Sequence, residues 1–367
     1  MTYRTELITD ERSFAGLDTD WRRLHRRCGS ATPFQSHAWL HSWWLSYGRP
    51  GRLRLLVVRD GPALVAAAPL MRVRRPVPAL VPLGGTISDY GDVLVDDEHG
   101  EAAVAELTDA LSAAARTALV DLREVRPGGA AERVYARWRG PRRQVDDSPC
   151  LELPAVPMPD LIARLPSAKS QQRARAKLRR LHALGVKSHV VLPCEAEAAV
   201  GRLLELHRLQ WQARGVNREH LRARFREHLV RSAGAMVCSG EAVVTEFRLD
   251  DEVVAVDLTL LSPGLAGGYL YGAHPRLRDR RADVATMLLD SCSGHSLAQG
   301  RGTLSLLRGD EPYKHHWRPR RVVNQRLLLA RRRTAPLLAA AVGDIAARRR
   351  GKEFLRGRKE RDGGGGG

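Results

Sequence analysis

The order of apolar segments in the second half of the chain constrains the fold more than any other feature of the sequence. Residues with helical spacing come first and predict helices over 160–184, from Ala196 to Arg214, and over 218–232. Four short apolar runs follow, AMVCSG, VVTEFRLD, EVVAVDLTLL and GYLYGAH, which are typical of strands. A helix over 283–298 and two further strands, GTLSLLRG and VVNQRLLLAR, are predicted to complete the series. This order predicts an α/β domain with a mainly antiparallel sheet.

The first half of the chain has an α/β pattern of its own. Apolar residues recur at helical intervals from Phe14 to Leu24, which predicts an amphipathic helix over 10–27 with Asp10 as its N-cap. A second helix, QSHAWLHSWWLSYG, carries three of the seven tryptophans, which together with Trp211 are expected to pack in a core or between domains. The predicted elements that follow are strands RLRLLVVRD and ALVAAAPLMRVR, strand YGDVLV, a helix from Glu101 to Arg116, strand ALVDLREV, helix AAERVYARW and strand PCLEL.

A proline-rich segment, LPAVPMPD, separates the two patterns. Three prolines in eight residues interrupt regular structure, so the segment predicts a boundary between a half over 1–153 and a half over 154–330. A length of 367 residues suits two domains, and an apolar content of 43% is enough to build two cores. After Arg331 the chain is predicted to form a basic helical or disordered tail over 331–367, which ends in five glycines.

The cysteines and the apolar runs favour a cytosolic location. The five cysteines are scattered, odd in number and never at metal-ligand spacing, which argues for a reducing compartment and against a disulfide framework or a zinc site. The first residues, MTYRTELITDERS, carry acids and no apolar stretch, so no signal peptide is expected. The longest apolar run, ALVAAAPLM, is far shorter than the roughly 20 residues of a membrane-spanning helix.

The net charge of +19 is concentrated in two segments. Residues 164–187 contain eight Lys and Arg residues and no acid, and residues 331–367 contain eleven against four acids, which leaves about +4 elsewhere. A solvated helix face and a solvated tail explain both segments. The alternatives are contacts of the basic helix 164–187 with tRNA, or of the tail 331–361 with an anionic membrane surface. Few aromatic residues accompany the basic helix, so base stacking is not indicated.

Residues 306–321, LLRGDEPYKHHWRPRR, combine acids, a Tyr-Lys pair, two histidines and several arginines. His315 and His316 are adjacent, so their side chains point in different directions and no metal site is predicted. Lys314 is placed to hold developing negative charge and Tyr313 to protonate a leaving group, because ligand groups gather at strand ends. Taken alone, the residue pattern slightly favours a turn with ordinary charged residues. The sequence contains no Walker, dinucleotide-binding, G-x-S-x-G or HExxH motif.

Seven segments in order resemble the CelD/BcsL-like acetyltransferases, a branch of the GNAT superfamily built from two GNAT-like halves, and the chain is also similar in plan to the FemABX transferases. These segments are TPFQSHAWLHSWWLSYG, LVVRDGPALVAAAPL, LGGTISDYGDVLV, RARAKLRRLHALGV, LLELHRLQWQARG, GYLYGAHP and RGDEPYKHHW. They cover roughly residues 10 to 330. The resemblance implies two GNAT-like domains, each with a mixed, mainly antiparallel sheet flanked by helices.

The resemblance also implies roles for particular residues. In FemABX enzymes a lysine after an aromatic residue at this point lies at the acceptor site and is thought to stabilise the transition state, and Lys314 after Tyr313 matches it. Asp89 and Tyr90 match a segment expected to face the same cleft. Asp89 is then a candidate base or ammonium anchor, and Tyr90 and Asp310 are candidate substrate-binding residues. A turn before strand YGDVLV explains Asp89 equally well.

A donor site for acyl-CoA is implied at the start of the helix predicted over 283–298. In GNAT domains the phosphates lie on backbone N–H groups there, aided by the helix dipole. Family members commonly have a Ser-Pro-Gly-like turn at this point, whereas this chain has Ala282-Asp283-Val284, and the aspartate repels phosphate. The candidate cofactor-binding residues are Arg276, Arg278, Arg280 and Arg281, which would act as side-chain phosphate ligands, together with Tyr271 and Gly272.

The sequence therefore predicts an acyltransferase that moves an acetyl or other acyl group from acyl-CoA to an amine, without a metal. The acceptor implied by the resemblance is a small metabolite or a cell-envelope or polysaccharide precursor. An aminoacyl-tRNA donor, as in FemABX proteins, is the first alternative. The second is a non-catalytic protein that binds polyanions or assists envelope assembly. The sequence leaves the oligomeric state open.

Overall fold

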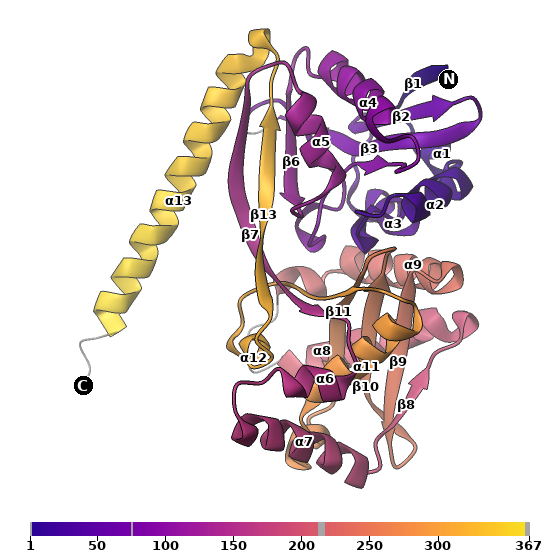
Figure 1. The fold of residues 1–367 in the computed structure, drawn as a ribbon, viewed down its shortest axis with the longest axis vertical. Helices are drawn as coiled ribbons and strands as arrows, with labels where there is room; N and C mark the ends of the chain where they lie inside the picture. Colours follow the sequence, from indigo (N-terminus) through magenta and orange to yellow (C-terminus); the bar gives the residue numbers. More distant parts are fainter. Residues whose placement is uncertain (1, 75, 212–216, 364–367) are drawn as a thin grey trace.

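The structure is a computed structural model that describes residues 2–74, 76–211 and 217–363. The described strands form one 13-stranded sheet that passes through both halves of the molecule (Figure 1). Its order is β1-β2-β3-β4-β6-β13-β7-β12-β11-β10-β9-β8, with β5 paired to β3. The first half of the chain lies at the top of Figure 1 and most of the second half lies below it.

The bounds of the elements follow the chain. The strands are β1 (Tyr3–Ile8), β2 (Leu53–Asp60), β3 (Ala63–Val73), β4 (Ala79–Pro82), β5 (Leu94–Val95), β6 (Leu119–Val125), β7 (Arg142–Pro154), β8 (Lys187–Val190), β9 (Ala242–Leu249), β10 (Glu252–Leu261), β11 (Leu265–Ala273), β12 (Thr303–Arg308) and β13 (Arg320–Leu329). The α-helices are α1 (Glu11–Ala15), α2 (Asp18–Arg27), α3 (His37–Tyr47), α4 (Gly100–Ala114), α5 (Ala130–Arg137), α6 (Met158–Ala163), α7 (Ala168–Ala183), α8 (Ala196–Trp211), α9 (Ala223–Ser239), α10 (Arg276–Asp279), α11 (Val284–Ala298), α12 (Pro312–His315) and α13 (Ala335–Gly363).

The two halves share strands at their junction. The C-terminal strand β13 lies between β6 and β7, so it completes the sheet of the first half. The end of β7 pairs with β12 through Leu153 and Leu304, and so extends into the second half. Both strands run along the left side of the molecule in Figure 1. The predicted boundary near residue 153 stays a prediction.

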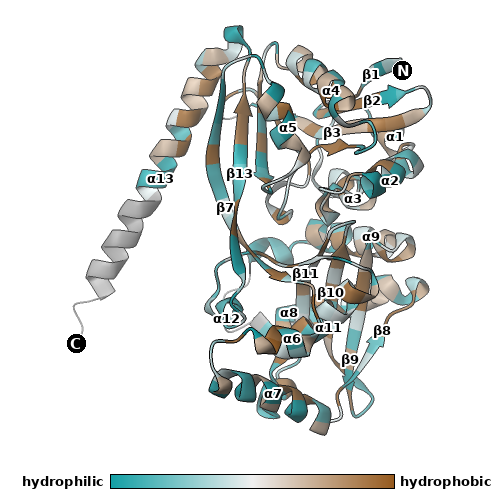
Figure 2. Cartoon of the chain, viewed as in Figure 1, coloured by the Kyte–Doolittle hydropathy of each residue, from teal (hydrophilic) through white to brown (hydrophobic). Residues whose placement is uncertain are grey.

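Two hydrophobic layers cover the sheet of the second half. On one face, Val256 and Leu258 of β10 belong to the same core as Leu203 of α8 and Leu229 of α9. A separate core joins Val254 of the same strand to residues of α7 and α11. Figure 2 shows the contrast between the apolar strands and α7. This helix is largely hydrophilic, and few of its residues are buried. This arrangement of helices on both faces of a mixed sheet confirms the predicted α/β class.

Several predicted elements differ from the observed ones. The run AMVCSG is not a strand, because α9 continues through it to Ser239 and ends at Gly240, whose positive φ of 75° suits a helix C-terminus. The helix predicted over 10–27 is divided into α1 and α2, although Asp10 caps α1 as expected by accepting from the Ser13 N–H. Strand YGDVLV is reduced to β5, and β1 and β4 were not predicted.

Helices α3 and α9 join the halves on the far side of the sheet from α11. Ser42 Oγ on α3 donates to the carbonyl oxygen of His228 on α9 at 2.9 Å, and Arg231 donates to the Ser42 carbonyl at 3.2 Å. Trp39, Trp43 and Trp44 are buried at this contact and in the adjoining core, as expected. The side chain of Trp211 lies outside the described residues.

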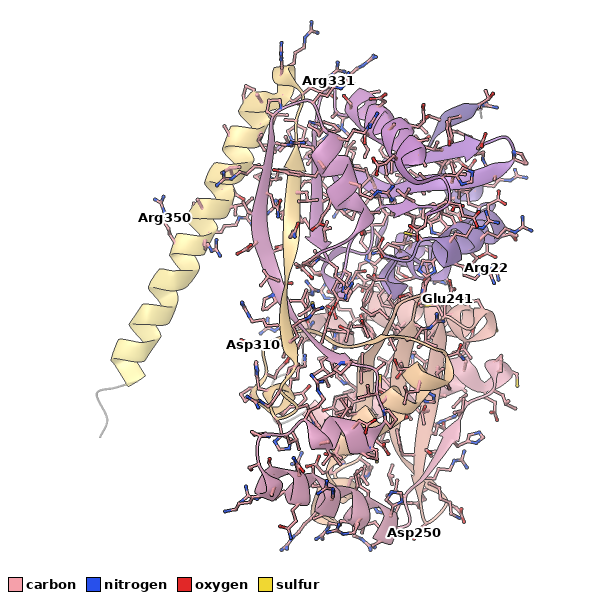
Figure 3. The ribbon with its side chains drawn as sticks, in the orientation of Figure 1. Arg22, Glu241, Asp250, Asp310, Arg331 and Arg350 are labelled. Carbon is pink, nitrogen blue, oxygen red and sulfur yellow. The ribbon has the colours of Figure 1, made fainter. Side chains whose placement is uncertain are left out.

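Helix α13 follows β13 and leaves the body of the molecule. Leu337, Leu338 and Ala341 of its first turns pack against residues of β4 and β6, and the rest of the ribbon extends away (Figure 1). Figure 3 shows Arg331 where β13 gives way to this helix and Arg350 about halfway along it. None of the helices in the described residues is long and apolar enough to cross a membrane. The final glycines, 364–367, lie outside the described residues.

Candidate functional site

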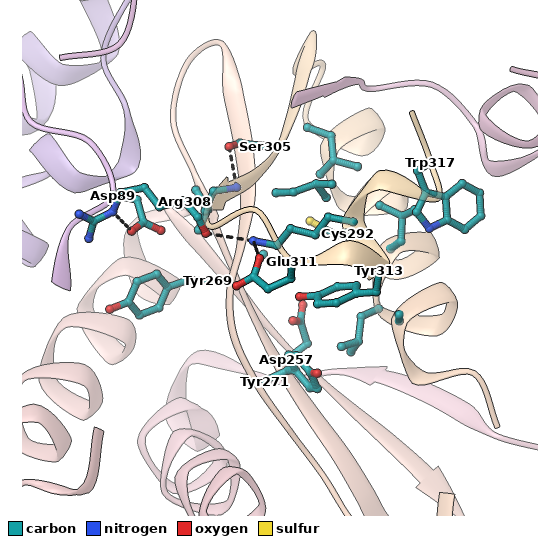
Figure 4. Close-up of a pocket in the computed structure, with 18 of the residues that line it drawn as sticks. Asp89, Asp257, Tyr269, Tyr271, Cys292, Ser305, Arg308, Glu311, Tyr313 and Trp317 are labelled. Carbon is teal, nitrogen blue, oxygen red and sulfur yellow. Dashed lines mark hydrogen bonds and ion pairs between the residues drawn. The ribbon is translucent and has the colours of Figure 1, made fainter. Parts of the chain in front are cut away.

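A cavity of about 410 Å³, here called the site cavity, lies at the junction of the two halves. Residues of β10, β11, α11, β12 and α12 form most of its wall, and Thr86, Ile87 and Asp89 of the first half close one side. Figure 4 shows the side chains that line it. The cavity therefore depends on residues more than 200 positions apart in the sequence.

The site cavity exists because two parallel strands separate. β11 and β12 pair only from Leu265 to Gly267, after which they diverge. β11 also contains a bulge, because Tyr269 is an extra residue between the pairs that Gly268 and Leu270 make with β10. A bulge takes the backbone groups of the extra residue out of the regular ladder. Backbone polar groups of β11 are therefore available where the cavity begins.

Lys314 lies in the wall of this cavity. Its side chain is 10% exposed, and Nζ lies 2.7 Å from Glu311 Oε2 and donates to the Arg308 carbonyl oxygen at 3.0 Å. Gly309, with a φ of 110°, turns the chain after β12, and Pro312 begins α12. The Gly-Asp-Glu-Pro-Tyr-Lys sequence thus carries Lys314 back against its own strand.

Arg308 at the end of β12 links the two halves. Its guanidinium donates to Asp89 Oδ1 at 2.7 Å, to Glu124 Oε1 at 3.0 Å and to the Thr86 carbonyl oxygen at 2.6 Å. Burial lowers the pKa of Arg308, but the charges of Asp89 and Glu124 outweigh this effect and leave the pKa above its usual range. Asp89 therefore lies beside the cavity as an ion-pair partner. Its predicted role as a base stays a prediction, and the ion pair competes with it.

β12 is irregular immediately before Arg308. Leu307 has a φ of 59°, in the left-handed region that a leucine rarely adopts, and the pairing of β12 with β7 shifts register between Ser305 and Arg308. The Leu307 side chain packs against Gly267, where a methyl group would lie 2.9 Å from Leu307 Cδ2. Such strain is often found at functional sites.

Asp257 is a buried carboxylic acid in the cavity wall. Its side chain, on β10, is 3% exposed and accepts one hydrogen bond, from Thr259 Oγ1 at 2.8 Å. Burial raises the pKa of Asp257 to about 7. Burial, followed by the charge of Asp257, raises the pKa of the neighbouring Cys292 thiol to about 12, so the thiol is neutral.

Two neutral histidines lie near another part of the wall. His207 Nδ1 donates to the Tyr271 carbonyl oxygen at 2.8 Å, so Nε2 accepts from His220 Nδ1 at 3.2 Å. Burial, followed by the charge of the neighbouring His207, lowers the pKa of His220 to about 4. His220 lines the cavity without contributing charge near neutral pH.

Of the predicted catalytic and substrate-binding residues, the structure brings Lys314, Tyr313 and Asp89 to the site cavity. Tyr313 is half exposed, and burial of part of its ring raises the pKa of its hydroxyl. Tyr90 does not line the cavity: it is buried behind it, with its hydroxyl 2.8 Å from Ser305 Oγ. Asp310 is exposed and pairs with His315 at 2.6 Å outside the cavity wall (Figure 3).

The predicted cofactor-binding residues are dispersed. Tyr271 lines the cavity, whereas Gly272 packs on α8, where a methyl group would overlap the backbone of Leu203 and His207. Arg276 pairs with Asp250 and Glu252 beyond the end of the sheet, and Figure 3 shows Asp250 at the bottom of the molecule. The remaining candidates, Arg278, Arg280 and Arg281, are exposed.

A carboxylate of the chain already occupies the start of α11. Asp283 is the N-cap, accepts from the Thr286 N–H at 2.9 Å and lies 2.8 Å from Lys177 Nζ on α7. The Lys177 hydrogen bond and the helix N–H group overcome burial and hold the pKa of Asp283 below its usual value. A phosphate at this helix start would have to displace or approach a carboxylate. The Ala282-Asp283-Val284 turn, which replaces the Ser-Pro-Gly-like turn of the family, therefore places an acid where phosphate was expected.

Sequence reasoning missed several residues of the site. Arg308 was recognised only as part of an arginine cluster, and Glu311 only as part of a turn. Asp257 was missed although a signal existed, because it is a charged residue in the middle of the apolar strand EVVAVDLTLL. Glu124 had no such signal: it becomes relevant only through its contacts with Arg308 and Asn324. In the described residues, no group of three or more His, Cys, Asp or Glu side chains is placed to hold a metal.

Comparisons with known proteins agree with this geometry. A family model described as "Acetyltransferase (GNAT) domain" matches residues 168–315. A search of curated proteins gave no match. Among solved structures, FemX has a TM-score of 0.62 at 11% identity, with 91% of this chain and 99% of that chain covered. A conserved protein of unknown function from Bacteroides thetaiotaomicron has a TM-score of 0.57 at 13% identity, with coverage of 89% and 100%.

A third structure is the C-terminal domain of a putative lysylphosphatidylglycerol synthetase from Agrobacterium fabrum, with a TM-score of 0.55 at 11% identity and coverage of 90% and 95%. At these identities the likeness establishes the fold and not the activity. Membership in the CelD/BcsL-like group stays a prediction. The chain has the GNAT fold, a mixed sheet flanked by helices in two halves, and residues 168–315 match the acetyltransferase (GNAT) domain model.

Proposed function

We propose that this protein is an acyltransferase that moves an acyl group from an activated carboxyl donor to an amine in the site cavity. One observation carries the proposal: the lysine ammonium of Lys314 lies in the wall of a cavity that opens where β11 and β12 separate. Developing negative charge on a carbonyl oxygen needs such a fixed donor in a site that excludes water.

The reaction is direct attack of a neutral amine on the donor carbonyl carbon. The new carbon–nitrogen bond forms, the bond from that carbon to the donor's sulfur or oxygen breaks, the amine loses a proton and the leaving group gains one. Lys314 and backbone N–H groups near the Tyr269 bulge hold the oxyanion. Tyr313, which also lines the cavity, is the proposed donor of the proton to the leaving group.

The donor is an acyl-CoA, such as acetyl-CoA, or an aminoacyl-tRNA. The GNAT domain match supports acyl-CoA. Two observations support aminoacyl-tRNA: Asp283 caps the helix start where CoA phosphates would bind, and the similar solved structures include FemX, in line with the FemABX resemblance that implies this donor. The exposed basic residues of α7 offer a surface for the tRNA backbone.

The acceptor is proposed to be an amine on a small metabolite or on a cell-envelope or polysaccharide precursor. Binding of the tail over 331–361 to an anionic membrane is part of the same proposal, as is a cytosolic location. The competing view is a non-catalytic binding protein on this fold. Loss of turnover in Lys314→Ala without loss of binding supports the enzyme over the binding protein.

The test compares wild type with Lys314→Ala and with Arg4→Ala, a control that removes an exposed basic residue of β1 away from the site cavity and from α7. Acetyl-CoA and a mixture of aminoacyl-tRNAs are offered with a panel of amines, and transfer of the labelled acyl group is followed. Lys314→Ala is expected to lower turnover about 100- to 1000-fold, as removal of one oxyanion donor does, while the control stays near wild type. Turnover by Lys314→Ala equal to wild type, or no transfer by wild type with either donor, contradicts the proposal.

A further inference from the structure

Among the side chains that line the site cavity, acidic residues outnumber lysine and arginine by one. They are Asp89, Asp257 and Glu311 against Arg308 and Lys314. The two cations are already paired, Arg308 with Asp89 and Glu124, and Lys314 with Glu311. Asp257 is the carboxyl group left over, in a chain whose formal net charge is +19.

Asp257 has no cationic partner in the described part of the chain. Among the described side chains, no Lys, Arg or His forms an ion pair with it, and the hydrogen bond from Thr259 Oγ1 satisfies one of its several lone pairs. Its neighbours in the cavity wall are apolar or neutral, including Leu289, Cys292 and Leu304. A carboxylate is costly in such surroundings unless a cation joins it, so its position against a cavity points to a ligand.

We infer that Asp257 binds a primary ammonium group of a substrate inside the site cavity. This inference rests on the proposed acyl transfer, and it adds the chemical class of the substrate. The ammonium has two sources in that reaction: an amino group on the acyl part of the donor, or the acceptor amine before it loses its proton. An ammonium is the group that fits, because it supplies both the missing charge and the hydrogen-bond donors that the carboxylate lacks.

The position of Asp257 explains how the group is reached. Asp257 on β10 lies opposite Tyr271 on β11, and Tyr271 belongs to the part of β11 beyond its pairing with β12. The carboxyl group thus lies at the level where the strands are open, with α11 across the cavity. In the view of Figure 4, Asp257 lies below Asp89 and Arg308.

The test measures binding by titration calorimetry on the full chain, with two matched pairs of probes. The donor pair is β-alanyl-pantetheine and butyryl-pantetheine, which differ in an ammonium and a methyl group at one position and carry no phosphate. The acceptor pair is butylamine and 1-butanol. Each is measured on wild type and on Asp257→Asn, which keeps the size of the side chain and its acceptor for Thr259.

A donor ammonium is shown if wild type prefers β-alanyl- over butyryl-pantetheine by about tenfold or more and Asp257→Asn abolishes the preference. An acceptor ammonium is shown if wild type prefers butylamine over 1-butanol by a similar factor, Asp257→Asn abolishes that preference, and the two pantetheine probes show no such difference. The inference is overturned if neither ammonium compound binds wild type more tightly than its neutral partner. The wild-type comparison decides this even if Asp257→Asn does not fold.

These outcomes are separate from those of the proposed function, because binding is read without turnover. Equal binding of the charged and neutral probes, together with transfer that depends on Lys314, overturns the ammonium site and leaves the acyltransferase intact. Absence of any binding by all four probes also overturns the ammonium site, and the transfer assay on wild type and Lys314→Ala decides the acyltransferase separately.

Discussion

Replacing Asp257 with asparagine is expected to stabilise the ligand-free protein above neutral pH, at the expense of ligand recognition. The wild-type carboxyl group is buried with one hydrogen bond, from Thr259, and the asparagine oxygen can accept the same bond. The variant removes a charge that the empty cavity does not compensate. A gain of stability that depends on pH is therefore the signature of a group kept for function.

The magnitude follows from the pKa of Asp257, which burial raises from 3.8 to about 7. Because the folded state holds the proton more tightly, the stabilisation is complete below pH 3.8 and is lost as the pH rises through 7. At about 1.4 kcal/mol per pKa unit, the full loss is roughly 4 kcal/mol. Between pH 5 and pH 8.5 the loss is about 2 to 3 kcal/mol, and the asparagine variant escapes it.

Urea denaturation of wild type and variant at both pH values measures this difference. Other groups that titrate in the same range, such as the buried Asp92, occur in both proteins and cancel in the comparison. Asp279→Asn, at an exposed carboxyl group on α10, is the matched control and is expected to behave like wild type. A difference between wild type and Asp257→Asn that is the same at pH 5 and pH 8.5 would refute the reasoning.

Two further predictions concern stability. Arg308→Met leaves the carboxylates of Asp89 and Glu124 without their partner, so it is expected to lower the free energy of unfolding, measured in urea, by roughly 3 to 5 kcal/mol. Arg222→Met, at an exposed arginine, is the control and is expected to change that free energy little. Equal losses in the two variants would contradict the bridging role of Arg308. Gly272→Ala is expected to lower the free energy of unfolding by about 1 to 3 kcal/mol, because its methyl group would meet the backbone of α8. Gly268→Ala is the control that is expected to be tolerated, since its methyl group would contact only Cys292 Sγ, at 3.9 Å. A stable Gly272→Ala variant with weakened donor binding would instead support the cofactor role predicted for Gly272.

Much of the fold was accessible from local pattern. The apolar strands from β9 to β11, helix α11 and strand β12 were placed correctly because their hydrophobic spacing and flanking turns agree with the burial that the fold imposes. The prediction for AMVCSG was wrong because β-propensity and helical burial compete in a short apolar segment, and here Met236 is buried as part of α9, in the same core as Leu203 of α8. No local signal indicated that β13 would insert between β6 and β7.

The candidate site was accessible only in part. Lys314 and Tyr313 follow an apolar strand closely enough for sequence and resemblance to single them out, and the structure places both in the site cavity. Tyr90 and Gly272 were singled out by the resemblance, but tertiary packing decides access: the Tyr90 side chain is buried in the core, and the backbone of Gly272 packs against α8. The pairing of Asp89 with Arg308 spans the two halves, and spacing along the chain does not encode it.

The sequence by itself determined the class of fold, the division into two α/β patterns, the concentration of basic charge and the strand-end lysine, because these depend on local periodicity and composition. Only the tertiary structure decided that β11 and β12 separate, that Asp257 faces the resulting cavity without a cation, and that Asp283 occupies the start of α11. The reason is physical: burial and charge pairing are properties of groups brought together from distant parts of the chain, and the pKa values and ligand preferences of the site arise from that assembly.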